Sequence, residues 1–193
     1  MSNDHHEENF IQKYVFSVDH KVIGLQYGVT SLLFLLFGFL LMAIMRYQLA
    51  YPEQVIPYIG NWIFSESGGV MLPENYNTLG AMHGTIMIFL GVVPLAVGAF
   101  GNYLVPLQIG APDMAFPKLN AASYWSYFVG GVIMIASFFT PEGAARSGWT
   151  SYPPLSIFES GQTMWLISMI FLITSSLLGS MNIIVTIVQL RAP

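Results

Sequence analysis

Residues 76–120 read YNTLGAMHGTIMIFLGVVPLAVGAFGNYLVPLQIGAPDMAFPKLN, and this stretch decides how the rest of the chain is arranged. It holds a long apolar segment with one histidine near its start, His83, and a proline at mid-span, Pro94. A lone carboxylate, Asp113, follows in a short loop just beyond the far end. A histidine inside a lipid-length segment and an acid beyond its end favour a bound cofactor and a proton entrance.

The composition around this stretch excludes a soluble domain. Of the 193 residues, 54% are hydrophobic and only 8% are charged, whereas about a quarter are charged in soluble domains. Because so little charge cannot cover a water-facing surface, we expect an all-α membrane protein with the lipid bilayer as its surroundings. The net charge of −4, without a basic patch, argues against a nucleic-acid partner. The chain has no cysteine, which excludes disulfides and thiolate metal sites.

Four apolar segments are long enough to cross a membrane, since about 20 residues span the hydrocarbon core. The predicted helices cover about residues 22–46, 76–104, 121–140 and 163–190. They form one four-helix region, 22–193, which follows a polar N-terminal segment, 1–21. Pro94 lies at mid-span, where partner helices must satisfy the carbonyl that it frees. Pro106 is expected to help end the second helix.

The distribution of lysine and arginine predicts the orientation in the membrane. With the N-terminus inside, four cations are cytoplasmic and two lie outside. The cytoplasmic ones are Lys13, Lys21, Lys118 and Arg191, and the outer ones are Arg46 and Arg146. The acidic start of the chain lacks the positive region and adjoining apolar core of a cleaved signal peptide. We therefore interpret residues 1–21 as a cytoplasmic segment before a retained first helix.

His83 supports two interpretations. A histidine in an apolar helix is costly unless it is paired or ligates something, so it either bonds to a neighbouring helix or holds a metal. Neutral imidazole is a common axial ligand of haem iron. Gly80 and Gly84 beside it would let a flat macrocycle approach the backbone.

Asp113 also supports two interpretations. An aspartate after Gly-Ala-Pro is most often a turn residue or a helix cap. Alternatively it collects protons and delivers them to a file of waters held by amides and hydroxyls. The available side chains are Asn102, Asn120, Ser175, Ser176 and Asn182. Ser175, Gly179 and Asn182 share one helical face, which marks a helix contact or a wet path.

Several separated motifs, in order, resemble the first third of subunit I of the haem–copper oxidases, over roughly residues 14–193. They are HGTIM at 83–87, FGNY at 100–103, IGAPDMAFP at 109–117 and GWTSYPPL at 148–155. The final Arg191-Ala192-Pro193 also fits. The resemblance is to the A-type, cytochrome c-oxidising members, whose subunit I is a bundle of about twelve helices.

The resemblance implies a haem site at the outer ends of the helices. His83 matches the axial ligand of the low-spin haem, expected to be haem a. Arg46 matches an arginine that contacts the haem formyl group, although from sequence alone it also reads as an interfacial anchor. Trp149 matches a tryptophan near the haem propionates, and we assign Tyr76 to the same site.

The resemblance also implies a proton-uptake path named for its aspartate. Its members are Tyr27, Asn102, Asp113, Asn120, Ser175, Ser176 and Asn182. The family often has Asn-Asn where this chain has Asn120-Ala121, so one polar lining group is lost.

Taken together, the expectation is part of a respiratory oxidase that reduces oxygen to water with electrons from cytochrome c and pumps protons. Expected partners are the remainder of subunit I and subunits II and III, in a bacterial plasma membrane or mitochondrial inner membrane. The high-spin haem and copper B are expected only with the part of the subunit beyond these four helices, in a longer chain or a split subunit. The alternatives are a quinol oxidase subunit and a non-catalytic membrane scaffold. Quinol-oxidising relatives have an Arg, an Asp and a His where this chain has Phe37, Leu41 and Asn75, which favours cytochrome c.

Overall fold

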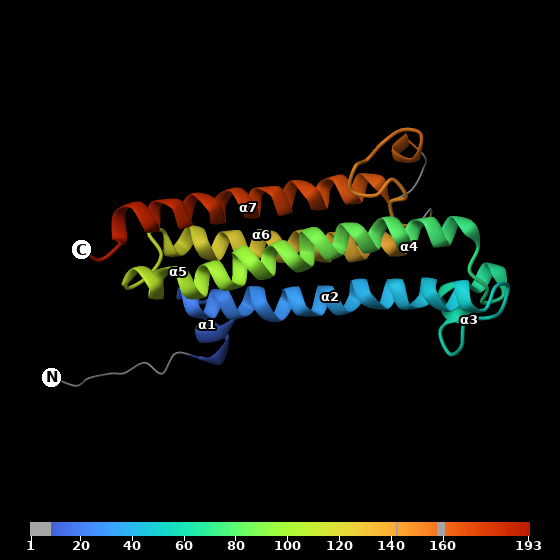
Figure 1. Ribbon diagram of the computed structural model, residues 1–193, viewed down its shortest axis with the longest axis horizontal. Coiled ribbons are helices and arrows are strands. Elements are labelled where there is room, and N and C mark those ends of the chain that lie inside the picture. Colours follow the sequence, from blue (N-terminus) through green and yellow to red (C-terminus); the bar gives the residue numbers. More distant parts are fainter. Residues whose placement is uncertain (1–8, 142, 158–160) are drawn as a thin grey trace.

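A computed structural model describes residues 9–141, 143–157 and 161–193. Within them the chain forms four long helices that lie side by side in one bundle (Figure 1). The connection at one end is short, and the two at the other end are longer and carry small helices. The long helices cover His20–Ala50, Pro73–Ile109, Pro117–Phe139 and Gln162–Leu190. Each is long and apolar enough to cross a membrane, which confirms the predicted all-α membrane fold.

The helices begin where capping chemistry allows. Helix α2 (His20–Ala50) starts after Asp19, whose carboxylate accepts the backbone N–H groups of Lys21 and Val22. Helices α4 (Pro73–Thr85) and α6 (Pro117–Ala136) each start with proline, which needs no N–H partner in the first turn. These starts lie slightly before the predicted ones because capping residues, not the first apolar residues, fix a helix end.

The second membrane span is one continuous helix of changing width. It runs through α4, two segments of wider π-type turns, η2 (Ile86–Val92) and η3 (Pro94–Gly101), and α5 (Asn102–Ile109). The polar pair at 101–102 does not interrupt it. The prediction that Pro106 helps end this helix is wrong. The helix continues past it and ends at Gly110, whose φ of 71° is the left-handed conformation that glycine adopts readily.

Both prolines inside this span lack an N–H donor, and a side chain from another helix bonds to the carbonyl four residues before each one. In an α-helix, the N–H of residue 94 would donate to the carbonyl of Leu90, and that of residue 106 to Asn102. Tyr127 Oη of α6 donates to the Leu90 carbonyl at 2.7 Å, and His20 Nδ1 of α2 bonds to the Asn102 carbonyl at 2.8 Å. A partner helix therefore bonds to a carbonyl in the turn before Pro94. The bond from Val93 N–H to the Ile88 carbonyl just before it has π-helical spacing, in which residue 94 would face the Phe89 carbonyl.

The core lies where the four spans approach one another. Helix α6 packs along α7 (Gln162–Leu190), and α2 packs along the second span. A glycine pair, Gly130-Gly131, permits the close approach of α6, since an added Cβ would lie 2.4 Å from Phe34 at one glycine and 3.1 Å from Leu172 at the other. Ser168 of α7 donates to the Gly130 carbonyl at 2.6 Å, which joins the two helices at this crossing.

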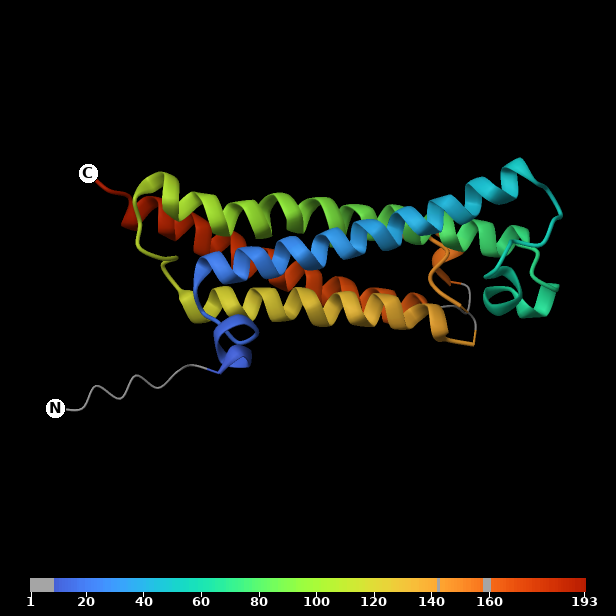
Figure 2. The same cartoon turned by 90° about the horizontal axis from the view of Figure 1, so that it is seen from below.

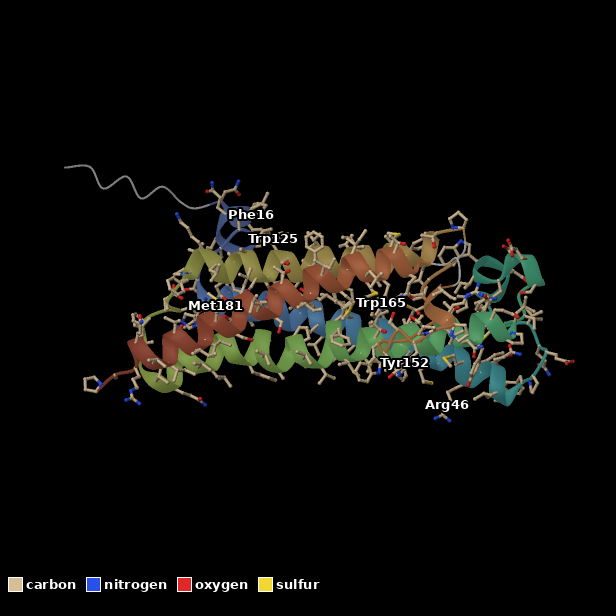
Figure 3. The ribbon with its side chains drawn as sticks, turned by 90° about the horizontal axis from the view of Figure 1, so that it is seen from above. Phe16, Arg46, Trp125, Tyr152, Trp165 and Met181 are labelled. Carbon is tan, nitrogen blue, oxygen red and sulfur yellow. The ribbon has the colours of Figure 1, made fainter. Side chains whose placement is uncertain are left out.

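The short elements gather at the two ends of the bundle. Helix α1 (Phe10–Tyr14) lies beside the start of α6, at the end where α5 stops and the chain terminates (Figure 2). Phe16 stacks on Trp125 there, with ring centroids 5.3 Å apart (Figure 3). The opposite end carries α3 (Gly60–Ile63), η1 (Ser65–Ser67), η4 (Ser137–Phe139) and η5 (Leu155–Ile157). We call these the Asp113 end and the His83 end.

Candidate functional site

A cavity of about 420 Å³ lies among α2, the wide turns of the second span and α7. Its walls are mainly apolar, with Phe89, Pro94 and Leu172 among them. The polar groups that reach it are few: Tyr27, Asn102, Tyr127, Ser175, Ser176 and Ser180. Four of these were candidates from the sequence, and three different spans bring them to one cavity.

Tyr27 is the centre of the polar contacts at this cavity. It is 4% exposed, and its hydroxyl lies 3.1 Å from Ser123 Oγ and 3.0 Å from Ser175 Oγ. Ser123 donates to the Asn120 carbonyl and Ser175 donates to the Ser123 carbonyl. Because both serine hydrogens are used, both serine oxygens accept from the single phenol hydrogen. The phenol can therefore turn between two acceptors, as a proton-carrying chain requires.

Two buried amides have polar atoms without a protein partner among the described residues. Both side-chain atoms of Asn120 and Oδ1 of Asn102 are in this state, and the two residues are 0% and 2% exposed. Asn102 Nδ2 donates to the Gly98 carbonyl at 2.7 Å. Unpaired buried amides are costly and rare, and ordered water is the usual partner of such atoms in proteins.

Asp113 is half-buried in the loop between α5 and α6. Its Oδ1 accepts the backbone N–H of Met114 at 2.6 Å. Helix α7 fixes the rest of the loop. Asn182 exchanges two hydrogen bonds with the backbone of Phe116, at 2.9 and 3.1 Å, and Thr186 accepts the N–H of Ala115 at 2.9 Å. The carboxylate therefore lies in a loop that is held in place at the Asp113 end of the bundle.

The sequence interpretation and the geometry differ at three of these positions. Asn182, expected to line the path, has its side-chain amide bonded to the Phe116 backbone. Ser123 and Thr186 were missed. Each is one turn from a residue that was selected, Ser123 at i+3 from Asn120 and Thr186 at i+4 from Asn182, so helical periodicity would have found both.

His83 lies in the N-terminal half of the second span, toward the His83 end of the bundle. Its Nδ1 bonds to the Gly38 carbonyl of α2 at 2.8 Å. Because a carbonyl only accepts, Nδ1 carries the hydrogen and Nε2 keeps its lone pair, with no hydrogen bond among the described residues. A second hydrogen bond that fixes the tautomer is typical of ligating histidines. The sequence left open a bond to a neighbouring helix or a ligand role, and the geometry is compatible with both.

The other three haem candidates lie near this end but do not contact one another. Tyr76 is half-buried and, at seven residues from His83, shares its helical face. Arg46 is exposed and points away from the bundle (Figure 3). Trp149 is 55% exposed, with its ring 6.4 Å from that of Phe89. Two of the three therefore face outward from the four helices.

The residues at His83 fit an axial haem ligand in their donor chemistry. No group of three His, Asp or Glu side chains is placed to hold a metal ion in the part of the chain that the structure describes. One imidazole is the contribution that a porphyrin-bound iron needs, because the macrocycle supplies four other ligands. A Cβ at Gly84 would meet no atom within 4 Å, whereas Gly80 faces Met45 at 3.2 Å. Of the two glycines, only Gly84 opens a flat approach.

The family model and the individual relatives that this chain resembles all indicate the same protein family. Residues 22–193 match the family described as Cytochrome C and Quinol oxidase polypeptide I. Cytochrome c oxidase subunit 1 of Thermostichus vulcanus is 48% identical over 93% of this chain, and that of Synechocystis sp. is 44% identical over 99%. The Heme-copper oxidase subunit I+III of Aeropyrum pernix is 42% identical over 95%.

These matches cover 30%, 32% and 21% of the three relatives, so the chain spans about a third or less of their length. The matched residues include all four membrane spans, the cavity and His83. The chain therefore belongs to the cytochrome c and quinol oxidase polypeptide I family.

Proposed function

We propose that this chain supplies the first four helices of subunit I in a proton-pumping cytochrome c oxidase. The assembled enzyme reduces oxygen to water with electrons from cytochrome c. It lies in a bacterial plasma membrane or mitochondrial inner membrane, with the N-terminus inside, and includes the remainder of subunit I and subunits II and III. The names of the relatives and the four membrane spans support this assignment.

His83 is the proposed axial ligand of a low-spin haem a. The orientation of its ring is the single observation that carries this role, because the Gly38 carbonyl holds Nδ1–H and leaves Nε2 free to ligate. When bound, the haem supplies one-electron transfer. Arg46, Trp149 and Tyr76 are the proposed contacts of its formyl, propionate and ring edges. The high-spin haem and copper B belong to the rest of subunit I.

Asp113 is the proposed entry point for protons. From it, protons move past the amides of Asn102 and Asn120 and the hydroxyls of Tyr27, Ser175 and Ser176, with Asn182 holding the entrance loop. Moving one charge against 100 mV costs about 2.3 kcal/mol, so a pump must prevent back-flow. The apolar walls of the cavity serve this purpose, since they confine water to the few polar groups.

Replacement of His83 by alanine in the assembled complex tests the haem assignment. We expect the low-spin haem absorption band to disappear and oxygen uptake to fall to background. Thr78→Ala is the matched control, because Thr78 lies on the same helix and bonds only to the Glu74 carbonyl one turn away. A His83→Ala complex that keeps the low-spin band contradicts the assignment and favours a scaffold role for these helices.

The family description includes quinol oxidases, so quinol is the second candidate donor. The purified complex is supplied with either reduced cytochrome c or a soluble quinol, and oxygen uptake is measured. We expect uptake with cytochrome c only. Uptake with quinol in the absence of cytochrome c contradicts the proposed donor without affecting the haem and proton assignments.

A further inference from the structure

The cavity wall contributed by the second span is held at two points. Both are carbonyls four residues before a proline, Leu90 before Pro94 and Asn102 before Pro106, where the N–H donor of a regular α-helix is missing. The cavity-lining part of this span runs from Phe89 to Asn102, between these two points. The hydrogen bonds that would normally fix this wall are therefore replaced by bonds to side chains of α6 and α2.

The Tyr127 contact fixes the wall at the point nearer the His83 end. Tyr127 is 1% exposed and donates to the Leu90 carbonyl at 2.7 Å, while Ser31 of α2 lies 3.2 Å from the same phenol oxygen. The phenol has one hydrogen, which goes to Leu90, so the Ser31 hydroxyl donates to Tyr127. One phenol thus connects α2, α6 and the second span at the turn where Pro94 removes a donor.

The His20 contact fixes the wall at the point nearer the Asp113 end. His20 is 2% exposed at the start of α2, and its Nδ1–H donates to the Asn102 carbonyl. Asn102 also lines the cavity, and its side-chain Oδ1 has no hydrogen bond among the described residues. The position of the Asn102 amide, which is proposed to bind water, therefore depends on the His20 imidazole at the start of α2.

We infer that Tyr127 and His20 are positioning residues of the proton path, which hold the proline-containing wall so that the cavity keeps its width. Neither residue needs to carry a proton, since each hydrogen is committed to a carbonyl. The inference rests on the proposed function for its effect on turnover. The two hydrogen bonds, from Tyr127 to the Leu90 carbonyl and from His20 to the Asn102 carbonyl, form a clamp on this wall. This clamp is a property of the chain itself and can be tested without measuring enzyme activity.

Tyr127→Phe in the assembled complex is the first test. It keeps the ring that stacks on Tyr27 at 5.1 Å and removes the donor to Leu90 together with the acceptor for the Ser31 hydroxyl. Tyr124→Phe is the matched control. Tyr124 is on the same helix and equally buried within a few percent, but its hydroxyl donates to the Thr30 side chain and does not reach the cavity.

We expect hydrogen–deuterium exchange of the peptide around residues 86–98 to become about tenfold faster in Tyr127→Phe, as loss of one buried hydrogen bond implies, and to stay unchanged in Tyr124→Phe. We expect turnover to fall about three- to tenfold. The KM for cytochrome c and the low-spin haem band stay constant, and the solvent isotope effect on turnover rises because proton uptake becomes limiting.

Restoring the donor distinguishes positioning from general damage. In Tyr127→Phe combined with Pro94→Ala, the new N–H of residue 94 can donate to the Leu90 carbonyl, so exchange and the isotope effect should return toward the parent values. His20→Phe with and without Pro106→Ala repeats the test at the second clamp. Exchange that is unchanged in Tyr127→Phe overturns the inference whatever the enzyme does.

Asp113→Asn, measured in the same preparation, separates this inference from the proposed function. If Asp113→Asn slows turnover and Tyr127→Phe alters neither turnover nor the isotope effect, the positioning role is wrong and the proton path stands. If Asp113→Asn has no effect while Tyr127→Phe accelerates exchange, the clamp stands and the path through Asp113 is wrong.

Discussion

The Asp113 end and the His83 end of the bundle differ in how many of their candidate residues contact one another within the four helices. At the Asp113 end, side chains of α2, α6 and α7 bond to one another around a cavity, and α7 fixes the entrance loop. At the His83 end, one imidazole is oriented by Gly38, while Arg46 and Trp149 face outward.

The difference follows from the groups that each task requires. A proton path needs hydroxyls, amides and bound water, which several neighbouring helices can supply together. An axial haem site needs an oriented imidazole and a large flat partner, and this chain offers the imidazole and an open face at Gly84. In the proposed function, the same four helices would build much of the proton path and contribute one ligand to the haem site.

The largest expected effect is that of Asp113→Asn. The amide keeps an oxygen that can accept the Met114 N–H, so the loop keeps its shape, but the side chain no longer titrates. We expect turnover to fall by about a hundredfold, at the lower limit for loss of a proton-transfer group, and pumping to cease. Protons released per electron by the complex in vesicles are the measurement.

Asp19→Asn is the control for this substitution. Asp19 lies at the same end and caps α2, a role that asparagine fills equally well. We expect both turnover and pumping to be unaffected. If the proton yield per electron is unchanged in Asp113→Asn, the Asp113 end has no role in proton uptake, and the two ends cannot be assigned different tasks.

The fold could be predicted from the sequence because uncharged runs such as 22–45 leave a bilayer as the only suitable solvent. The end of the second span could not. Pro106 removes only its own N–H, and whether the helix survives depends on His20, which lies 82 positions from the bonded Asn102 carbonyl. Local sequence shows where a donor is lost, whereas the packed structure shows what replaces it.

Four of the six polar residues at the cavity were selected from the sequence, but their contacts could not be predicted from it. Asn182 was selected as a path residue, yet its amide holds the entrance loop. Tyr127 was not selected as a site residue from the sequence, and it is buried in the interior and bonds to the Leu90 carbonyl. These roles depend on which helices pack together, and that information is distributed over the whole chain.

The next largest effect is expected at the His83 end, from Arg46→Met. If the guanidinium bonds to the haem, its removal destabilises the reduced, more negative form and lowers the midpoint potential. A charge-assisted hydrogen bond corresponds to about a tenfold change in the equilibrium or more, which is about 60 mV for one electron. Redox titration of the low-spin band in the assembled complex measures the shift.

Arg46→Lys separates charge from hydrogen-bond geometry, since lysine keeps the charge but not the planar fork. We expect an intermediate potential. If Arg46→Met has the same potential as the parent complex, Arg46 is an interfacial anchor that extends to the headgroups. The His83 end would then contribute the imidazole without a charged contact.

The smallest effect is expected from Ser176→Ala, which sharpens the comparison within the Asp113 end. Ser176 lines the cavity, but its hydroxyl has no hydrogen bond among the described residues, whereas Ser175 beside it bonds to Tyr27 and to the Ser123 carbonyl. A cavity-lining hydroxyl that makes no protein hydrogen bond can be replaced by water, so turnover in Ser176→Ala should stay within about twofold.

Ser175→Ala removes an acceptor and a donor from the contacts around Tyr27 and should slow turnover more. Turnover rates of the two variants, measured side by side, decide the point. An equal or larger loss in Ser176→Ala would mean that water contacts, and not the Tyr27 centre, limit proton uptake.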